Sequence, residues 1–150
     1  MTAADVQSLM TNVVAGDDVS DVGLDSDGQQ CVFHDMDSEQ AVDIIVVPAS
    51  DAAIGYDQAK KQATDPVPLD GVGDEAFRET GDLDPYAEHG GIMCTVSLSE
   101  AIEIPGVDAL VVGGKLDLTE DQNVIIAKAL GTVCNRIFGA GNTEPDLSGL

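Results

Sequence analysis

The chain has 150 residues, with 28 acidic residues against six basic ones and a formal net charge of -22 at pH 7. Nucleic acids and anionic membrane surfaces bind clustered lysine and arginine, so this composition argues against both as direct partners. Hydrophobic residues make up 43% of the chain, which is enough for one folded core, whereas aromatic residues make up only 3%.

Hydrophobic spacing and turn-forming residues divide the chain into helices, strands and loops. In chain order we predict a helix over residues 2–14, strands over 29–35 and 41–47, a helix over 51–62, an extended segment over 65–70, and a glycine turn entering a strand over 71–77. A loop over 80–91, strands over 92–98, 101–104 and 109–112, and a helix over 119–138 complete the order.

Local signals set the ends of the early elements. Residues 15–18 should stop the first helix, and an acidic connection over 17–28 should lead to the first strand. Pro48 should end the second strand, because proline lacks a backbone donor. Ser50 and Asp51 should then cap the following helix.

The last strand and the last helix have clear patterns. Apolar residues alternate with others along 92–98, which predicts a half-buried strand with Cys94 on its apolar face. Thr119 and Gln122 form a capping box at the start of the last helix. Its apolar stripe includes Cys134.

The order of these elements predicts an α+β fold. We expect a mainly antiparallel sheet packed by an N-terminal helix and a long C-terminal helix. A single domain should span residues 2–138, followed by a flexible tail over 139–150.

Three cysteines allow several redox states. A helix crossing the sheet can bring Cys94 and Cys134 together, because both face the predicted core. Their disulfide would close a loop of about 40 residues and stabilise the fold by roughly 3–4 kcal/mol. Pairing of Cys31 with either of them, or three reduced thiols in the core, are the alternatives.

Two patterns resemble metal sites, and both are incomplete. Asp25, Asp27 and Gly28 match the start of a calcium loop, but His34 stands where that loop needs a glutamate. Cys31 and His34 have zinc-like spacing, yet residues three apart on a strand point to opposite faces. The sequence therefore predicts neither a metal site nor a cofactor.

Catalytic patterns are also incomplete. Residues 71–73 lack the third glycine and the following helix of a phosphate loop, and neighbouring carboxylates would repel phosphate. The cysteines are predicted to face the core rather than to present exposed thiolates. We predict no catalytic residues and no enzyme. The alternative is a small acidic enzyme with an acid/base cleft near Asp74, Glu75 and His89, although adjacent acids on a strand face opposite sides.

Residues 71–77, Gly-Val-Gly-Asp-Glu-Ala-Phe, resemble the G-x-G-D-E-A-[FY] turn of small extracytoplasmic actinobacterial domains of unknown function. These domains are often lipoproteins, and a similar fold occurs in extracellular sensor domains of mycobacterial receptor kinases. The order of elements looks similar over most of residues 2–138. The chain departs from the family in having no lipobox cysteine or signal peptide, and in having Val32 and Phe33 where Trp often follows the strand cysteine. The matching motif residues are Gly71, Gly73, Asp74, Glu75 and Phe77.

The resemblance implies a non-enzymatic, exported accessory or sensor-like domain at the cell surface. It would be the mature segment of a secreted or cell-surface protein, and it would bind an unknown ligand or a cell-envelope protein. The acidic composition and the core-facing cysteines agree with export. A purely structural or inhibitory interaction module is a further alternative.

Overall fold

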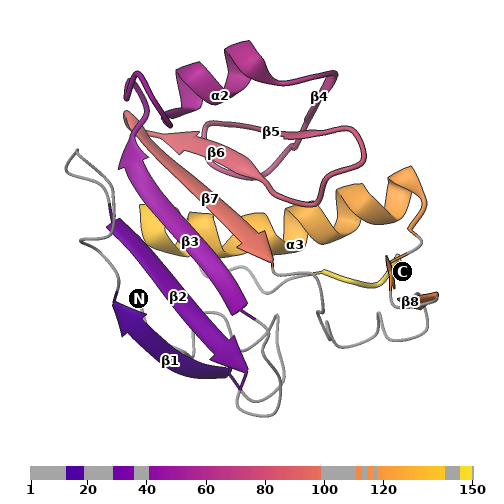
Figure 1. Ribbon diagram of the computed structural model, residues 1–150. Helices are drawn as coiled ribbons and strands as arrows, with labels where there is room; N and C mark the ends of the chain where they lie inside the picture. Colours follow the sequence, from indigo (N-terminus) through magenta and orange to yellow (C-terminus); the bar gives the residue numbers. More distant parts are fainter. Residues whose placement is uncertain are drawn as a thin grey trace.

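The computed structural model describes residues 13–18, 29–35, 41–98, 111–112, 115–116, 118–140 and 146–149. Within them, seven strands form one antiparallel sheet in the order β1-β2-β3-β7-β6-β5-β4 (Figure 1). The strands are β1 (Val13–Asp18), β2 (Gln29–Asp35), β3 (Ala41–Pro48), β4 (Pro66–Pro68), β5 (Glu75–Glu79), β6 (Tyr86–His89) and β7 (Ile92–Leu98). A separate pair consists of β8 (Val111–Val112) and β9 (Lys115–Leu116). The helices among the described residues are α2 (Tyr56–Gln62) and α3 (Glu120–Phe138).

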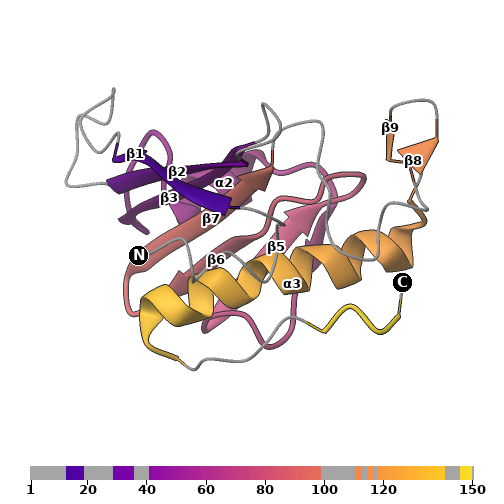
Figure 2. The same cartoon turned by 90° about the horizontal axis from the view of Figure 1, so that it is seen from below.

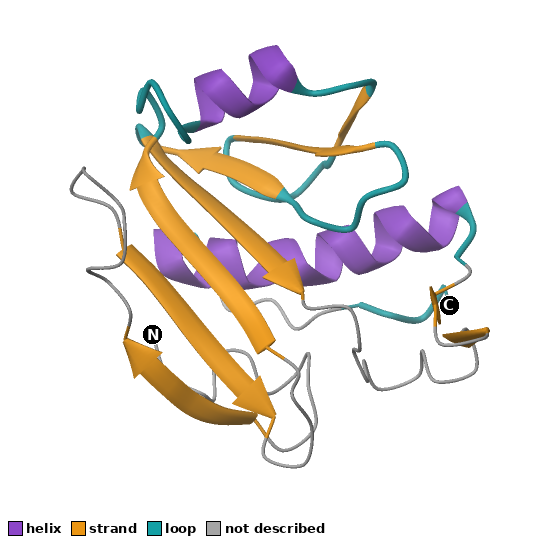
Figure 3. Cartoon of the chain, in the orientation of Figure 1, coloured by secondary structure: helices purple, strands orange, loops and turns teal. Residues whose placement is uncertain are grey.

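This arrangement is the predicted α+β fold with an antiparallel sheet (Figure 3). The predicted strands over 29–35 and 92–98 are confirmed as β2 and β7, and the strand over 41–47 is confirmed as β3, which includes Pro48. The predicted strand over 109–112 is confirmed for Val111–Val112, which form β8, and residues 109–110 lie outside the described residues. The predicted strand over 101–104 lies outside the described residues.

Helices α2 and α3 pack against opposite faces of the sheet. The 19-residue α3 runs along one face (Figure 2). It shares a core there with Ile44, Cys94 and Val96. On the other face, Tyr56 of α2 packs with Met93 and with other buried residues. Alternate residues of each central strand therefore enter different cores.

Burial on both sides corrects the prediction for β7. Cys94 is buried on the predicted apolar face, but Met93 and Thr95 on the opposite face are only 1% and 8% exposed. The strand is therefore buried on both faces rather than half-buried, because α2 and the segments beside it cover the second face.

The start of the sheet corrects the predicted end of the N-terminal helix. Val13 and Val14 begin β1, and the residues predicted to stop a helix continue this strand to Asp18. β1 pairs antiparallel with β2, so tertiary pairing outweighs the weak helical preference of these β-branched residues. Residues 2–12 of the predicted helix lie outside the described residues.

The start of α2 is also later than predicted. Oδ1 of Asp51 accepts hydrogen bonds from the backbone N–H groups of Ala53 and Ile54, at 2.8 and 3.1 Å. This side chain therefore closes a turn before the helix instead of capping the helix itself. Gly55 is the N-cap of α2, and Tyr56 is its first residue.

The predicted loop over 80–91 contains a strand that sequence patterning does not reveal. Residues Tyr86–His89 form β6, which pairs with β5 on one side and with β7 on the other. The segment is acidic and punctuated by glycine and proline, but backbone pairing on both sides supplies hydrogen bonds that are independent of side-chain identity.

The closing helix follows its sequence signals. Thr119 and Gln122 exchange the two hydrogen bonds of a capping box, and Gly139 takes the left-handed conformation at the C-cap, with φ of +70°. Leu147, beyond the helix, packs against the core on the α3 side.

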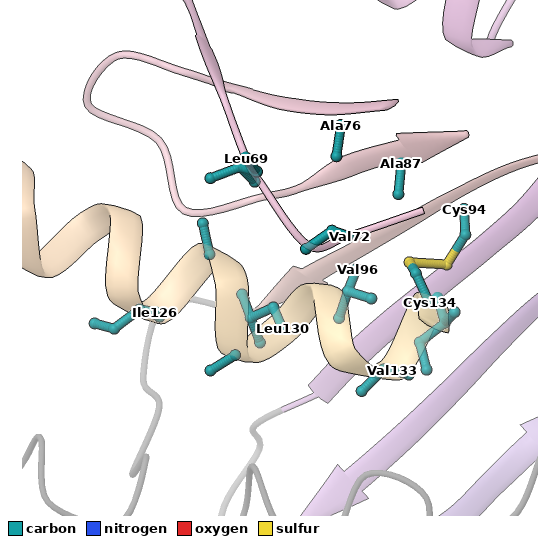
Figure 4. Close-up of a cluster of buried hydrophobic side chains, with 13 residues drawn as sticks. Leu69, Val72, Ala76, Ala87, Cys94, Val96, Ile126, Leu130, Val133 and Cys134 are labelled. Atoms are coloured by element: carbon teal, nitrogen blue, oxygen red, sulfur yellow. A yellow bond between two sulfur atoms is a disulfide. The ribbon is translucent and has the colours of Figure 1, made fainter. Parts of the chain in front are cut away.

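A disulfide joins β7 to α3. Cys94 and Cys134 are both fully buried and their Cα atoms are 5.6 Å apart (Figure 4). The predicted pairing is confirmed, and the alternatives in which Cys31 takes one of these partners, or all three cysteines are reduced, are wrong. Cys31 lies in β2, opposite Ile44 of β3.

Candidate ligand-binding clefts

The glycine turn before β5 has the conformation that its sequence predicts. Gly71 and Gly73 have φ values of +85° and +57°, a region that side-chain-bearing residues rarely adopt. A Cβ atom at Gly73 would also lie 2.4 Å from the backbone oxygen of Glu88. The same oxygen accepts a hydrogen bond from the N–H of Asp74, at 2.8 Å. Glycine at position 73 therefore permits a close approach between the turn and β6.

Asn135 of α3 holds the other side of this turn. Its Oδ1 accepts a hydrogen bond from the N–H of Gly73, and its Nδ2 donates one to the backbone oxygen of Gly71, both at 2.8 Å. The residue is only 9% exposed. Sequence patterning missed this role, although a polar residue directly after Cys134 on a mostly apolar helix was a usable signal.

The structure brings together two of the three residues of the predicted acid/base cleft. Nδ1 of His89 lies 3.0 Å from Oδ1 of Asp74, and Oδ2 of Asp74 accepts a hydrogen bond from the N–H of Gly90. The ring of His89 also packs against Phe138 of α3, with 5.4 Å between ring centroids.

Glu75 has a different partner. Its Oε2 lies 2.7 Å from Nζ of Lys60 on α2. The hydrogen bond with Lys60 lowers the pKa of Glu75, and the same bond raises the pKa of Lys60. Glu75 is thereby favoured as a carboxylate, whereas a general acid needs a raised pKa. The three predicted residues do not form one acid/base cluster.

A cleft of about 360 Å³ opens beside the glycine turn, and we call it the turn cleft. It has apolar walls from the core and charged groups around them. Its lining residues are Tyr56, Lys60, Pro66, Pro68, Leu69, Asp70, Gly71, Val72, Gly73, Asp74, Glu75, Ala76 and Phe77.

Aromatic rings separate this cleft from a second one. Phe77 packs edge-on against Tyr56, with centroids 5.4 Å apart, and stacks on Tyr86, with centroids 5.1 Å apart. Phe77 is 3% exposed, so the aromatic residue of the predicted motif is a core residue. Tyr86 then contributes to the wall of the second cleft.

The second cleft, of about 340 Å³, lies between α2 and the sheet, and we call it the sheet-face groove. The groove has an apolar floor and a mixed rim, and Ile54 on the rim is 36% exposed. Residues from β3, β5, β6 and β7 face α2 and the turn before it. The lining residues are Ile45, Ala53, Ile54, Gln58, Ala59, Gln62, Glu79, Tyr86, Met93 and Thr95.

Three carboxylates act on the hydroxyl of Tyr86, which lines the groove. Burial raises the pKa of the Tyr86 hydroxyl, and the negative charges of Asp84, Asp82 and Glu79 raise it further. Both effects disfavour the phenolate, since it would be poorly hydrated and close to other anions. At neutral pH the hydroxyl of Tyr86 is therefore uncharged, and negatively charged carboxylates lie near it.

Arg78 precedes Glu79 in β5, but its positive charge does not lie in the groove. Its side chain is fully buried, and its guanidinium donates to the backbone oxygens of Glu79 and Asp82 and to the carboxylate of Glu120. Neighbouring strand residues point to opposite faces, so Arg78 lies on the α3 side while Glu79 lines the groove.

The described residues contain no group of three or more histidine, cysteine, aspartate or glutamate side chains that could hold a metal ion. Asp25, Asp27 and Gly28 of the calcium-like pattern lie outside the described residues. None of the described helices is both long and apolar enough to cross a bilayer. Comparison of the chain with family models, curated proteins and solved structures gives no match.

Proposed function

We propose that this protein is a non-enzymatic, exported accessory or sensor-like domain that binds a ligand at the cell surface, in the sheet-face groove. The observation that carries the proposal is the apolar floor of this groove, formed by Ile45, Ala59 and Met93. Ligand sites are usually concave and largely apolar, with a few polar groups that orient the ligand. Gln58, Thr95 and the acids near Tyr86 would have that orienting role.

Two properties support export. The Cys94–Cys134 disulfide is buried in the core, and such bonds persist mainly in oxidising compartments. The net charge of -22 gives a strongly hydrated surface, which favours solubility outside the cell. The turn over 71–77 adds the resemblance to extracytoplasmic actinobacterial domains.

An acid/base enzyme is the second candidate, favoured by the contact between Asp74 and His89. An oriented imidazole can act as a base. The ion pair of Glu75 with Lys60 removes the third predicted group, so the groove supports ligand binding better than the contact of Asp74 with His89 supports catalysis.

Binding of Nile red, a neutral apolar dye, tests the proposal. We expect saturable binding at one site, measured as a blue shift of its emission. Ala59→Phe should abolish binding, because the larger side chain fills the groove. Ala53→Phe, at an exposed position on the rim, should weaken binding with less risk to folding.

The matched control is Ala140→Phe, which places the same side chain at an exposed position after α3. It should leave dye binding unchanged. The proposal is wrong if wild-type protein shows no saturable binding, or if folded Ala59→Phe and Ala53→Phe proteins bind the dye as wild type does.

A further inference from the structure

The sheet-face groove has a negative charge on one wall. Among its described lining residues, Glu79 is charged and none is lysine or arginine. Hydrogen bonds hold the nearby carboxylates in place: Glu79 accepts from the N–H of Thr64 at 3.1 Å, and Asp84 accepts from the hydroxyl of Ser97 at 2.7 Å. These groups therefore form a fixed negative field beside an apolar floor.

Two basic residues on elements beside the groove have partners elsewhere. Lys60 lies on α2 but pairs with Glu75 at the turn cleft. Arg78 is directed to the α3 side and binds Glu120 there. Neither side chain lines the groove, so neither supplies a positive charge beside its apolar floor.

We infer that the groove binds a small amphiphile whose apolar chain lies on Ile45 and Met93 and whose cationic head lies beside Glu79. The inference rests on the proposed function and adds the chemical class of its ligand. It follows from charge complementarity between an acidic groove wall and a positive head group.

The shape of the site favours a small molecule over a peptide. The groove lies on the face of strands β3, β7, β6 and β5, and each of these strands is paired on both sides. An extended peptide would therefore find no free strand edge to which its backbone could bond. The volume of about 340 Å³ lies near the lower end of the range for small-molecule pockets, roughly 300–1,000 Å³.

Three probes with the same chain and different heads test this inference: dodecylamine, dodecanol and dodecanoate, each below its micelle concentration. Affinities come from displacement of Nile red or from calorimetry. We expect the amine to bind about fivefold more tightly than the alcohol, and the carboxylate to bind more weakly than the alcohol.

Two glutamine variants distinguish a local charge from the general acidity of the protein. Glu79→Gln keeps an acceptor for the N–H of Thr64 and should reduce the preference for the amine to about twofold or less. Glu88→Gln is the matched control, because Glu88 accepts from the N–H of Gly91 and does not line the groove. It removes the same charge and should keep the preference.

Each outcome has a distinct meaning. Equal binding of amine and alcohol, both lost in Ala59→Phe, overturns the inference and leaves the proposed function standing. Equal effects of the Glu79 and Glu88 variants also overturn it, because the attraction would then come from overall charge. Tighter competition by a lysine-flanked apolar peptide than by dodecylamine overturns the assignment to a small molecule. Probe binding that Ala59→Phe and Ala53→Phe do not affect overturns the proposed function itself.

Discussion

The backbone N–H of Gly73 donates a hydrogen bond of 2.8 Å to Oδ1 of Asn135, 62 residues later in the chain. The same side chain reaches the backbone oxygen of Gly71, so one residue of α3 fixes the conformation of the whole glycine turn. The glycine turn lines the turn cleft and leads into β5.

Asn135→Ala should destabilise the protein by about 1–3 kcal/mol, because two backbone groups lose a partly buried partner. The measurement is urea unfolding, followed by circular dichroism. Asn123→Ala is a matched control: Asn123 lies in the same helix and is also 9% exposed, but its side-chain bond to Glu120 is 3.4 Å long. If Asn135→Ala lowers the free energy of unfolding no more than Asn123→Ala does, the turn does not depend on the hydrogen bonds of Asn135.

Local patterns predicted the parts of the fold whose signals lie within one segment. The capping box at Thr119 and Gln122, the alternation along β7 and the glycines at 71 and 73 each reflect a constraint on neighbouring residues. The pairing of Cys94 with Cys134 could be predicted for a related reason, since both positions face inward on elements that pack together.

The remaining features depend on contacts between distant segments. β6 forms because β5 and β7 flank it, although its own sequence reads as a loop. The sheet-face groove combines residues from four strands, α2 and a turn, so no single segment carries its pattern. Asp74 and Glu75 are adjacent in sequence, but their partners, His89 and Lys60, come from different elements.

Reduction of the Cys94–Cys134 disulfide should lower the free energy of unfolding. For a sequence separation of 40 residues, loop-closure entropy predicts a loss of roughly 3–4 kcal/mol. Urea unfolding with and without a thiol reductant measures it, and the double variant Cys94→Ala/Cys134→Ala should be insensitive to the reductant.

Thiol counting extends this test to the native compartment. Protein recovered from its cells and denatured without reductant should have no more than one free thiol among its three cysteines. Three free thiols would contradict the disulfide in that compartment and weaken the proposal of export.

Thermal stability should increase with salt. Area scaling gives a folded surface of roughly 7,000 Å², hence about one net negative charge per 300 Å² and about 18 Å between charges. The Debye length is about 30 Å at 10 mM salt and about 8 Å at 150 mM, so repulsion is screened only at the higher concentration. The melting temperature should therefore rise between about 10 mM and 150 mM NaCl. A flat response would mean that self-repulsion contributes little to stability.

Tyr86 should make stability fall in alkaline solution. Burial, Asp84, Asp82 and Glu79 raise its pKa in the folded protein above the ordinary value of 10.0. As pH rises, the Tyr86 hydroxyl therefore loses its proton in the unfolded chain before it does so in the folded protein. The contribution of Tyr86 to stability is complete below about pH 10 and is lost as pH rises through the folded pKa. Tyr86→Phe keeps a ring to stack on Phe77 and should show a smaller loss of unfolding free energy between about pH 9 and pH 11.

The control for this prediction changes a neighbouring charge and keeps the phenol. Asp82→Asn retains an acceptor for the N–H of Leu83 and should lower the pKa of Tyr86 toward its ordinary value. The ultraviolet absorbance of the phenolate measures that pKa, with Tyr56→Phe as the background that leaves Tyr86 as the single tyrosine. An unchanged titration in Asp82→Asn would show that this carboxylate does not act on Tyr86.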